Sequence, residues 1–385
     1  MGRFLKSLAK GVLICVLMLA ASLGVCAAAG LVEFPERGRS EAEVPQVHVV
    51  EPQEEESQEE GPQEEEPAEI SLPEGGEDPV TLLFAGDLFL TDLLQSKYNQ
   101  QGIGAAASEG LLSVLRDADV FMLNQEFPFG TTGEAMEEKE YTFRVDPGYI
   151  SVLSDLSADI VTLANNHMLD FGRSPLTETL HTLDQAGIAH VGAGENLEEA
   201  KALKTFEING KTVGFLGASR VIPVASWNAS SGSSGVFTTY DASALVEEIE
   251  KAEESCDFTV VYVHWGIEKN NQPEEYQKTL ARQYIDAGAD AVIGAHPHVL
   301  QGIEYYQGKP IFYSLGNFIF SNGTYESMLV SLTLGEDGTG IRLIPCVSEA
   351  NQMRLLEESK TESFYRSLES ISFGISIGTD GTLSG

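Results

Sequence analysis

The chain has 385 residues, of which 42% are hydrophobic and 21% charged, a balance that allows one large folded domain or two ordinary ones. Its formal net charge of -36 at pH 7 argues against nucleic acid and against an anionic membrane surface as electrostatic partners.

The first predicted element is a membrane-directed helix in residues 1–32. Three basic residues in its first ten positions precede an uncharged run from Gly11 to Val32. As a helix this run measures roughly 33 Å, enough to cross a bilayer, and the positive charge before it orients the rest of the chain to the extracytoplasmic side. In order of preference, the segment remains a single-pass anchor in the cell membrane, is cleaved near residues 27–29, or is lipidated at Cys26. The last two outcomes give a secreted or a lipid-anchored protein.

Residues 33–78 are rich in Glu, Gln and Pro and almost free of aromatic residues. Such a segment cannot bury enough apolar surface to offset the entropy of ordering it. We interpret it as a disordered acidic linker, with a calcium-binding tract as the alternative. It leads to a folded domain of residues 79–350, followed by a C-terminal helix and tail in residues 351–385.

The folded domain is predicted to be of the α/β class. Short apolar runs, typical of strands buried on both faces of a parallel sheet, alternate with amphipathic helices. The buried strands are predicted at residues 80–85, 120–123, 159–163, 258–263 and 290–294, and the helices at about 103–116, 174–186, 241–255 and 273–287. Antiparallel pairs are predicted within 206–218, turning at Asn209-Gly210, and later at 303–306 with 311–315 and 328–334 with 341–347. This order indicates a layered fold in which the parallel strands carry the chemistry.

Two of the four cysteines, Cys256 and Cys346, fall in the folded domain. The chain has no CxxC motif or other spacing typical of a metal site. These two cysteines could pair outside the cell or remain free thiols.

Polar residues that could bind a metal follow each of the five buried strands. In open α/β sheets, ligands bind at the carboxyl ends of the strands. Taken singly, each residue has an ordinary explanation as a cap, a turn residue or a hydrogen-bonded core histidine. Their recurrence at successive strand ends is better explained by a metal site. The set is Asp87, Asn124, Glu126, Asn166, His167, His264, His296 and His298.

This mixture of carboxylate, imidazole and amide groups suits Mn, Zn or Fe better than Mg or Ca. We expect one or two divalent ions. A pair would need about six or seven protein ligands, and it would activate water and bind a tetrahedral phosphate. A purely structural metal is a weaker explanation, because structural zinc sites favour cysteine ligands and the set contains none.

Six motifs resemble those of the CapA family, the poly-γ-glutamate capsule biosynthesis proteins, whose fold is similar to that of the calcineurin-like metallophosphoesterases. In chain order they are FAGD at 84–87, LNQE at 123–126, LANNHMLDFG at 163–172, HWGIE at 264–268, GAHPHVLQ at 294–301 and YSLGNFIF at 313–320. The resemblance implies a layered α/β/β/α sandwich of the metallo-dependent phosphatase type.

The resemblance also implies roles for individual residues. His167 would be the general acid for the leaving oxygen, and Asp170 would orient it or cap the next turn. The superfamily usually has a histidine two residues after the first aspartate, but that position is Phe89, so one metal position lacks a ligand. The implied metal ligands are Asp87, Glu126 (bridging), Asn166, His264, His296 and His298.

Further residues are candidates for contact with substrate. Arg144 could bind a phosphate or a γ-glutamyl carboxylate through two hydrogen bonds, or it could form a surface salt bridge. Asn124 and Asn317 are the other candidates for substrate binding, and Asn124 could instead complete the metal site. Glu268 could orient His264, or it could simply be exposed.

These observations predict an extracytoplasmic, metal-dependent phosphoesterase-type protein. The resemblance implies that it acts in the biosynthesis, export or anchoring of poly-γ-glutamate or a related anionic envelope polymer. The alternative is a non-catalytic, metal-containing component that binds the polymer within a membrane synthase or export complex. Phe89 favours this alternative, whereas His167, which a binding site does not require, favours the enzyme.

Overall fold

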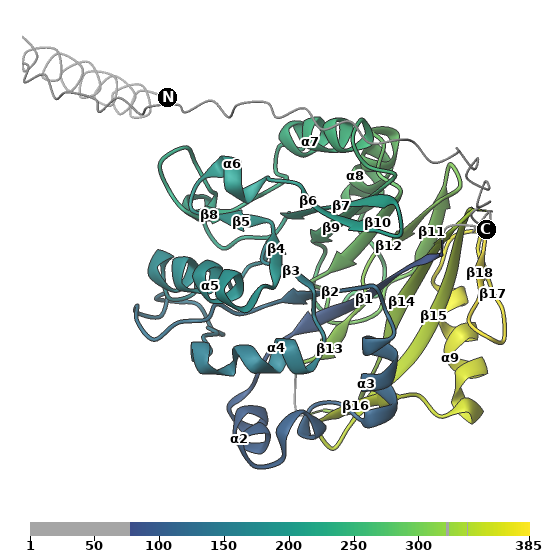
Figure 1. Cartoon of the computed structure of the whole chain (residues 1–385), viewed down its shortest axis with the longest axis horizontal. Coiled ribbons are helices and arrows are strands. Elements are labelled where there is room, and N and C mark those ends of the chain that lie inside the picture. Colours follow the sequence, from purple (N-terminus) through teal and green to yellow (C-terminus); the bar gives the residue numbers. More distant parts are fainter. Residues whose placement is uncertain (1–77, 321–322, 337) are drawn as a thin grey trace, which may run out of the picture. The chain divides into compact units, whose positions relative to one another are not determined.

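The structure is a computed structural model that describes residues 78–320, 323–336 and 338–385 (Figure 1). The described residues belong to one compact unit. The predicted helix of residues 1–32 and nearly all of the predicted linker of residues 33–78 lie outside the described residues. Within the described part of the chain, no helix is both long and apolar enough to cross a membrane.

An eight-stranded sheet contains the strands that begin the domain. Its strand order is β16-β15-β14-β1-β2-β3-β4, and β13 pairs with β1. The pairs β1–β2, β2–β3 and β3–β4 are parallel, while β14, β15 and β16 extend the sheet in antiparallel pairs. The strands are β1 (Val80–Leu88), β2 (Val120–Gln125), β3 (Ile160–Thr162), β4 (Ala189–Val191), β13 (Asn317–Ile319), β14 (Tyr325–Gly335), β15 (Gly338–Glu349) and β16 (Gln352–Leu355).

A six-stranded sheet has the order β11-β12-β10-β9-β7-β6. Its four inner strands are parallel, and β6 and β11 are antiparallel edge strands. The predicted turn at Asn209-Gly210 joins β6 to β7, and both residues have the positive φ that a two-residue hairpin requires. The strands are β6 (Lys204–Ile208), β7 (Lys211–Ser219), β9 (Phe258–His264), β10 (Ala291–Ala295), β11 (Ile303–Tyr306) and β12 (Lys309–Phe312).

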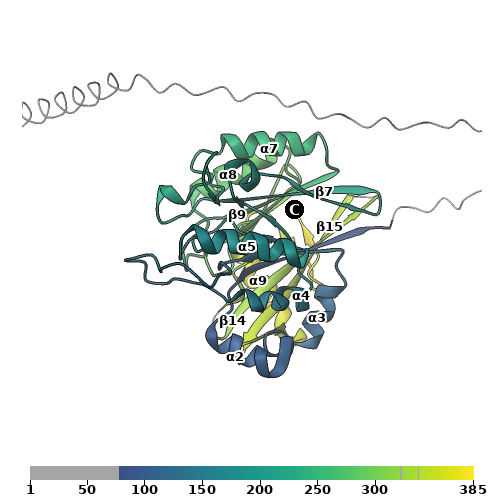
Figure 2. The same cartoon turned by 60° about the vertical axis from the view of Figure 1, so that its left-hand side comes forward.

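The two sheets face each other across an apolar core, and helices cover their outer faces (Figure 1, Figure 2). Successive side chains of β1 point to opposite faces of the sheet. Leu82 and Phe84 belong to the core between the sheets, while Leu83 and Ala85 belong to the core under the helices. The helices over the eight-stranded sheet are α3 (Glu109–Arg116), α4 (Ser151–Asp155) and α5 (Arg173–Ala186). Those over the six-stranded sheet are α7 (Ser243–Glu253) and α8 (Glu275–Asp286). The layer order is therefore α/β/β/α.

The remaining elements lie between these or follow β16 at the end of the chain. They are α2 (Asp92–Gln101), η1 (Gly102–Ala105), η2 (Pro147–Ile150), β5 (Ala193–Gly194), α6 (Leu197–Ala200), η3 (Ala225–Trp227), β8 (Gly235–Val236), α9 (Glu358–Ser370), β17 (Ser376–Ile377) and β18 (Leu383–Ser384).

The helix predicted at 103–116 is wrong in its first half. Residues Gly102–Ala105 form a 3-10 turn, and α3 begins only after Ser108, whose side chain accepts a hydrogen bond of 3.3 Å from the Leu111 N–H. The preceding helix α2 was not predicted, because it buries only Leu94 and lacks an apolar stripe.

The predicted boundary at residue 350 does not divide the structure. Strand β16, at residues 352–355, pairs with β15 and completes the edge of the large sheet. Helix α9 then places Phe364, Tyr365 and Leu368 in the core between the sheets. The C-terminal segment is therefore part of the folded unit.

The two cysteines of the folded unit are free thiols. Cys346 is buried within β15, and Cys256 is half-buried just before β9. Burial raises the pKa of the Cys346 thiol to about 12.

Candidate metal centre

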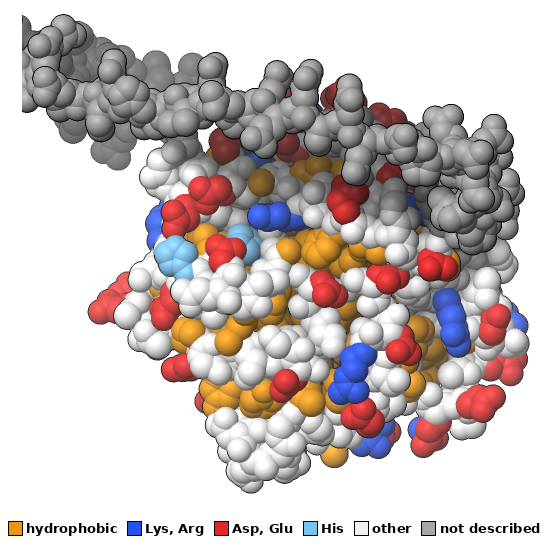
Figure 3. Space-filling model, in the orientation of Figure 1, with side chains coloured by type: hydrophobic (Ala, Val, Ile, Leu, Met, Phe, Trp, Pro, Cys, Tyr) orange, Lys and Arg blue, Asp and Glu red, His pale blue; other side chains and the backbone are white. Residues whose placement is uncertain are grey.

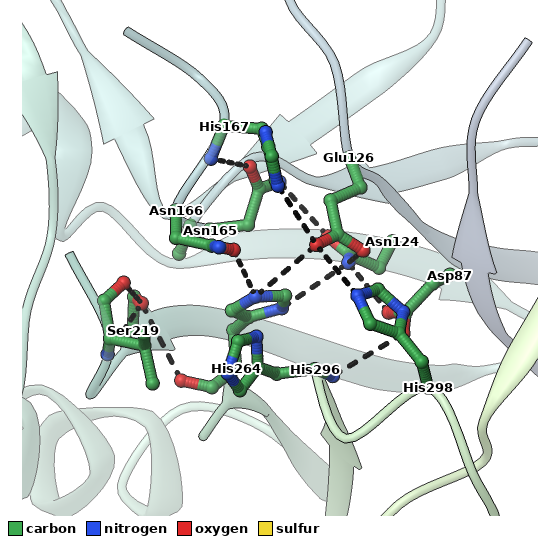
Figure 4. Close-up of polar contacts among 12 residues, drawn as sticks. Asp87, Asn124, Glu126, Asn165, Asn166, His167, Ser219, His264, His296 and His298 are labelled. Atoms are coloured by element: carbon green, nitrogen blue, oxygen red, sulfur yellow. Dashed lines mark hydrogen bonds and ion pairs between the residues drawn. The ribbon is translucent and has the colours of Figure 1, made fainter. Parts of the chain in front are cut away.

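The predicted ligands gather where the two sheets meet, at the carboxyl ends of four parallel strands (Figure 4). Asp87 lies near the end of β1, and Glu126 directly follows β2. His264 is the last residue of β9, where it pairs with Ala295 at the end of β10. His296 and His298 follow β10. The eight-stranded sheet therefore supplies Asp87 and Glu126, and the six-stranded sheet supplies the three histidines.

Gly86 allows β1 to bend into this position. A Cβ atom at this residue would lie 1.8 Å from the Gly316 carbonyl oxygen, so no other residue fits. The next backbone N–H, that of Asp87, donates to the same oxygen at 3.0 Å. This contact fixes the Asp87 side chain beside the cluster.

The Glu126 carboxylate occupies the centre of the cluster. Its Oε1 lies 3.6 Å from His264 Nε2, 3.7 Å from His298 Nε2 and 4.0 Å from His167 Nε2. The residue is fully buried, and Oε1 has no hydrogen-bond partner among the described residues. A buried carboxylate oxygen surrounded by imidazoles and left without a donor fits a metal ligand.

Two overlapping groups of donor atoms share Glu126. One consists of Asp87, Glu126 and His298, and the other of Glu126, His264 and His296. In each group the donor atoms lie within 4.8 Å of one another. His296 Nδ1 is a second buried atom without a hydrogen-bond partner in the described structure. These residues therefore fit one or two divalent ions, with Glu126 as the bridging carboxylate.

The sequence-predicted amide ligand lies against one of these groups. Asn166 Oδ1 is 2.8 Å from His264 Nε2, which donates to it. An ion bound by both atoms would replace that proton, as metal binding to imidazole requires. The structure thus brings Asn166 together with the other predicted ligands.

Asn124 and Asn317, predicted to contact substrate, each contact a candidate ligand. Asn124 Nδ2 donates to Asp87 Oδ1 at 2.8 Å. His298 Nδ1 lies 2.8 Å from Asn317 Oδ1 and 3.1 Å from Asp87 Oδ2. Both oxygens accept, so a proton on Nδ1 would leave His298 Nε2 free to bind a metal. Both amides are buried, and these contacts orient the ligands.

His296 and His298 both adopt positive φ angles, of 97° and 57°. This left-handed region is unfavourable for residues other than glycine and costs of order 1–3 kcal/mol for each residue. The structure nevertheless holds both histidines there, one on each side of Pro297, with their imidazoles directed toward the carboxylates (Figure 4).

Burial and mutual repulsion decide the charge of the cluster. Burial, together with the Asp87 charge, raises the pKa of Glu126 well above its ordinary value. Burial lowers the pKa of His264 well below its ordinary value, and burial with the nearby His298 lowers that of His296 to about 3. Neutral imidazoles beside crowded carboxylates suit a divalent cation, because no imidazolium charge opposes its binding.

His167 lies at the margin of the cluster and is held by Asp170. His167 Nδ1 is 2.7 Å from Asp170 Oδ2, while His167 Nε2 faces Glu126. Burial lowers the pKa of His167, and the hydrogen bond to Asp170 opposes this shift. The geometry matches the predicted orientation of His167 by Asp170.

Lys139 is a component of this site that the sequence did not reveal. Its Nζ forms an ion pair with Asp170, lies 3.1 Å from His167 Nδ1 and donates to the Asn166 carbonyl at 2.5 Å. Lys139 occurs in a charged stretch that has no helical or strand periodicity. No sequence signal distinguishes it from a solvated lysine.

An aromatic stack occupies the place of the missing histidine. The Phe89 ring stacks on Phe143 with centroids 3.9 Å apart, and Phe143 in turn stacks on His167 at 4.0 Å. The third ring of the group, that of Phe320, lies 4.5 Å from His298. Phe89 therefore forms part of the wall of the site and offers no donor atom.

Arg144 is engaged elsewhere. Its Nη1 donates to the carbonyl oxygens of Thr132 and Gly133 at 2.6 and 3.1 Å, and its guanidinium lies 4.1 Å from the centre of the Phe171 ring. These contacts fasten the loop that precedes it. By contrast, the exposed Glu268 has a carboxylate oxygen within 4.8 Å of donor atoms of His296 and His298.

Comparisons with known proteins agree with the predicted family. A family model described as "Bacterial capsule synthesis protein PGA_cap" matches residues 81–322. The chain is 33% identical over 269 residues to the PGA biosynthesis protein CapA of Bacillus subtilis (strain 168), covering 69% of this chain and 70% of that protein. It is 30% identical over 281 residues to the capsule biosynthesis protein CapA of Bacillus anthracis, covering 69% of this chain and 66% of that protein.

Among solved structures, the 5'-nucleotidase of Candida albicans SC5314 aligns with a TM-score of 0.39 and 12% identity. The alignment covers 69% of this chain and 52% of that one. At this TM-score the likeness carries no argument.

Proposed function

The chain belongs to the bacterial capsule synthesis protein family PGA_cap, and on that premise we propose that it acts in the synthesis, export or anchoring of poly-γ-glutamate or a related anionic envelope polymer. The names of its relatives support a role beside the polymer or its synthesis machinery.

The chemistry we propose is metal-dependent hydrolysis of a phosphoester. The observation that carries it is the buried Glu126 carboxylate, which is common to two groups of donor atoms and has an unpartnered oxygen among the described residues. Asp87, Glu126 and His298 would hold one divalent ion, and Glu126, Asn166, His264 and His296 the other. Ions bound there supply Lewis acidity toward a phosphate oxygen and toward water.

Within this proposal, His167 protonates the leaving oxygen. Its Nε2 faces the cluster, while its Nδ1 lies 2.7 Å from Asp170 Oδ2, and Lys139 pairs with the same carboxylate. An imidazole fixed in this way can deliver a proton to one defined point at the edge of the site. Stacking on Phe143 restricts rotation of the ring.

The second candidate function is non-catalytic binding of the polymer. The aromatic side chain at Phe89 favours it, because one of the two donor groups then contains only Asp87, Glu126 and His298. In this version the cation would bind polymer carboxylates directly.

We also propose that the protein acts outside the cytoplasmic membrane. This proposal rests on the sequence of residues 1–32, where basic residues precede a long uncharged run. Protease treatment of intact and permeabilised cells that produce the chain tests this proposal. Protection of the folded unit in intact cells, with cleavage after permeabilisation, would contradict it.

The test of function combines metal analysis with turnover. We would measure bound metal in the purified chain by elemental analysis and hydrolysis of an aryl phosphodiester and monoester with added manganese. Glu126→Gln should lose both metal and turnover. His167→Ala should keep the metal and lose turnover by about 100-fold or more.

The matched control is His181→Ala, which removes an exposed imidazole from α5 and should change neither quantity. Bound metal without turnover under any metal loading would refute the proposed hydrolase and favour non-catalytic binding of the polymer. Absence of metal in the wild-type chain would overturn both.

A further inference from the structure

The backbone of an arginine lies beside that of the candidate ligand His264, at the end of the neighbouring strand β7. The last residue of β7, Ser219, pairs with His264 in the register of the sheet and lies beside it in Figure 4. The next residue, Arg220, donates its backbone N–H to the His264 carbonyl at 2.8 Å. The position of Arg220 is thus fixed by the backbone of a candidate ligand.

Arg220 differs from the other arginines of the described residues in having no hydrogen bond or ion pair from its guanidinium. The other guanidinium groups each bind a carboxylate, a side-chain amide or a backbone carbonyl. They are those of Arg116, Arg144, Arg173, Arg282, Arg342, Arg354 and Arg366. Arg220 is therefore the exception among the described arginines, because its guanidinium N–H groups have no acceptor within the described residues.

Two tyrosine rings hold the Arg220 guanidinium instead. Its central carbon lies 4.2 Å from the centre of the Tyr240 ring and 5.5 Å from that of Tyr276. Tyr276 is fixed in turn, because its hydroxyl accepts a hydrogen bond of 2.7 Å from the backbone N–H of Gly266, two residues after His264. Contact with aromatic rings engages the face of a guanidinium and leaves its in-plane N–H groups available for a carboxylate or phosphate.

The Tyr240 ring, which contacts the Arg220 guanidinium, also lines an apolar hollow. The hollow has a volume of about 240 Å³ and is lined by Tyr240, Asn228 and residues 222–225. Tyr240 and Val224 are exposed there, at 53% and 39%. A cation next to an aliphatic surface suits a ligand that joins a carboxylate to methylene groups, as a γ-linked glutamyl unit does.

The face drawn in Figure 3 has no basic patch that would attract a polyanion. Its basic side chains are scattered among acidic ones. On this face, affinity for an acidic polymer would come from individual cations.

We propose that Arg220, held by Tyr240 and Tyr276, binds a carboxylate of the acidic polymer substrate next to the metal centre. This inference rests on the proposed function and extends it, by assigning the residue that recognises the polymer. A phosphate group could bind the same guanidinium, so the test includes both anions.

The experiment measures binding of oligo-γ-glutamate and, separately, of inorganic phosphate to the purified chain by calorimetry, with metal content determined in parallel. Arg220→Gln should weaken oligo-γ-glutamate binding at least tenfold without changing metal content. Arg220→Lys should weaken it less, because it keeps the charge and loses only the planar fork. Arg366→Gln removes the same charge from an exposed position on α9 and should have no effect.

The inference is overturned if Arg220→Gln and the wild-type chain bind oligo-γ-glutamate equally. It is also overturned if the substitution affects only phosphate binding, or if the wild-type chain binds no oligomer. Arg220-dependent binding in a chain that holds no metal would uphold the inference and refute the proposed hydrolase. Metal-dependent turnover, together with oligomer binding that does not depend on Arg220, would support the proposed hydrolase and refute the inference about Arg220.

Discussion

The Phe143 ring stacks on the His167 imidazole, with their centroids 4.0 Å apart and their planes inclined by 18°. The backbone N–H of Phe143 also donates to Asp170 Oδ2 at 2.7 Å, the oxygen that holds His167. The loop that carries Phe143 is therefore tied to the imidazole and to its carboxylate partner.

Phe143→Ala should lower phosphoester turnover by on the order of 10- to 100-fold while leaving bound metal unchanged, because His167 loses the surface that restricts its ring. Turnover and elemental analysis check this. The control is Tyr141→Ala, which removes a 63% exposed ring from the same loop. Equal losses in both variants would assign the effect to the loop and contradict the role of the stack.

Phe89→His should increase manganese affinity about tenfold, since it adds an imidazole to the wall of the site, where Phe89 contacts Phe320, the neighbour of His298. Equilibrium dialysis against manganese measures the change. Part of the stack with Phe143 and Phe320 is lost, so thermal stability without metal should fall. Unchanged affinity would mean that the position cannot reach the ion.

Lys139→Met should lower the free energy of unfolding by about 3 kcal/mol, because it leaves the fully buried Asp170 carboxylate without its cation. Urea unfolding of metal-free protein measures this. Lys360→Met, which removes an exposed charge paired with Glu357, should change it by less than about 1 kcal/mol. Similar values for the two lysines would show that the Lys139–Asp170 pair contributes no more than a surface pair.

His190 should make folding sensitive to mild acid. Burial lowers its pKa in the folded state below the ordinary value of 6.5, although Asp184 partly opposes this. The unfolded chain therefore binds a proton that the folded chain excludes, and stability is lost as the pH falls below about 6.5. The wild-type chain should lose more stability between pH 7.5 and 5 than His190→Gln. Parallel pH profiles would contradict the prediction.

The sequence was sufficient to locate the candidate ligands. Parallel strands buried on both faces are continuous apolar runs, and the polar residue that ends each run must lie at the common edge of the sheet. Asp87, Glu126, His264 and His296 were found in this way, and the structure brings them together. The end of a buried strand can be recognised from the local sequence, without knowledge of the tertiary fold.

The residues around the ligands depend on contacts between distant segments. Lys139 meets Asp170 across 31 positions that include α4 and β3, and Lys139 itself lies in a charged stretch without periodicity. The sequence predicts Arg144 as a candidate for contact with substrate. In the structure its guanidinium binds two backbone carbonyls, whereas that of Arg220 has no such partner among the described residues. Tertiary packing decides which basic side chains are already bound to other groups of the protein. These contacts cannot be read from the sequence.

The sharing of Glu126 between two donor groups has a consequence for how ions would be taken up. An ion bound to either group orients the same carboxylate and neutralises the same charge that the other ion needs. The two affinities are therefore thermodynamically linked, and each ion changes the affinity for the other by the same factor. Favourable coupling would fill both positions in one steep transition with rising metal concentration, whereas unfavourable coupling would fill them in two separate steps.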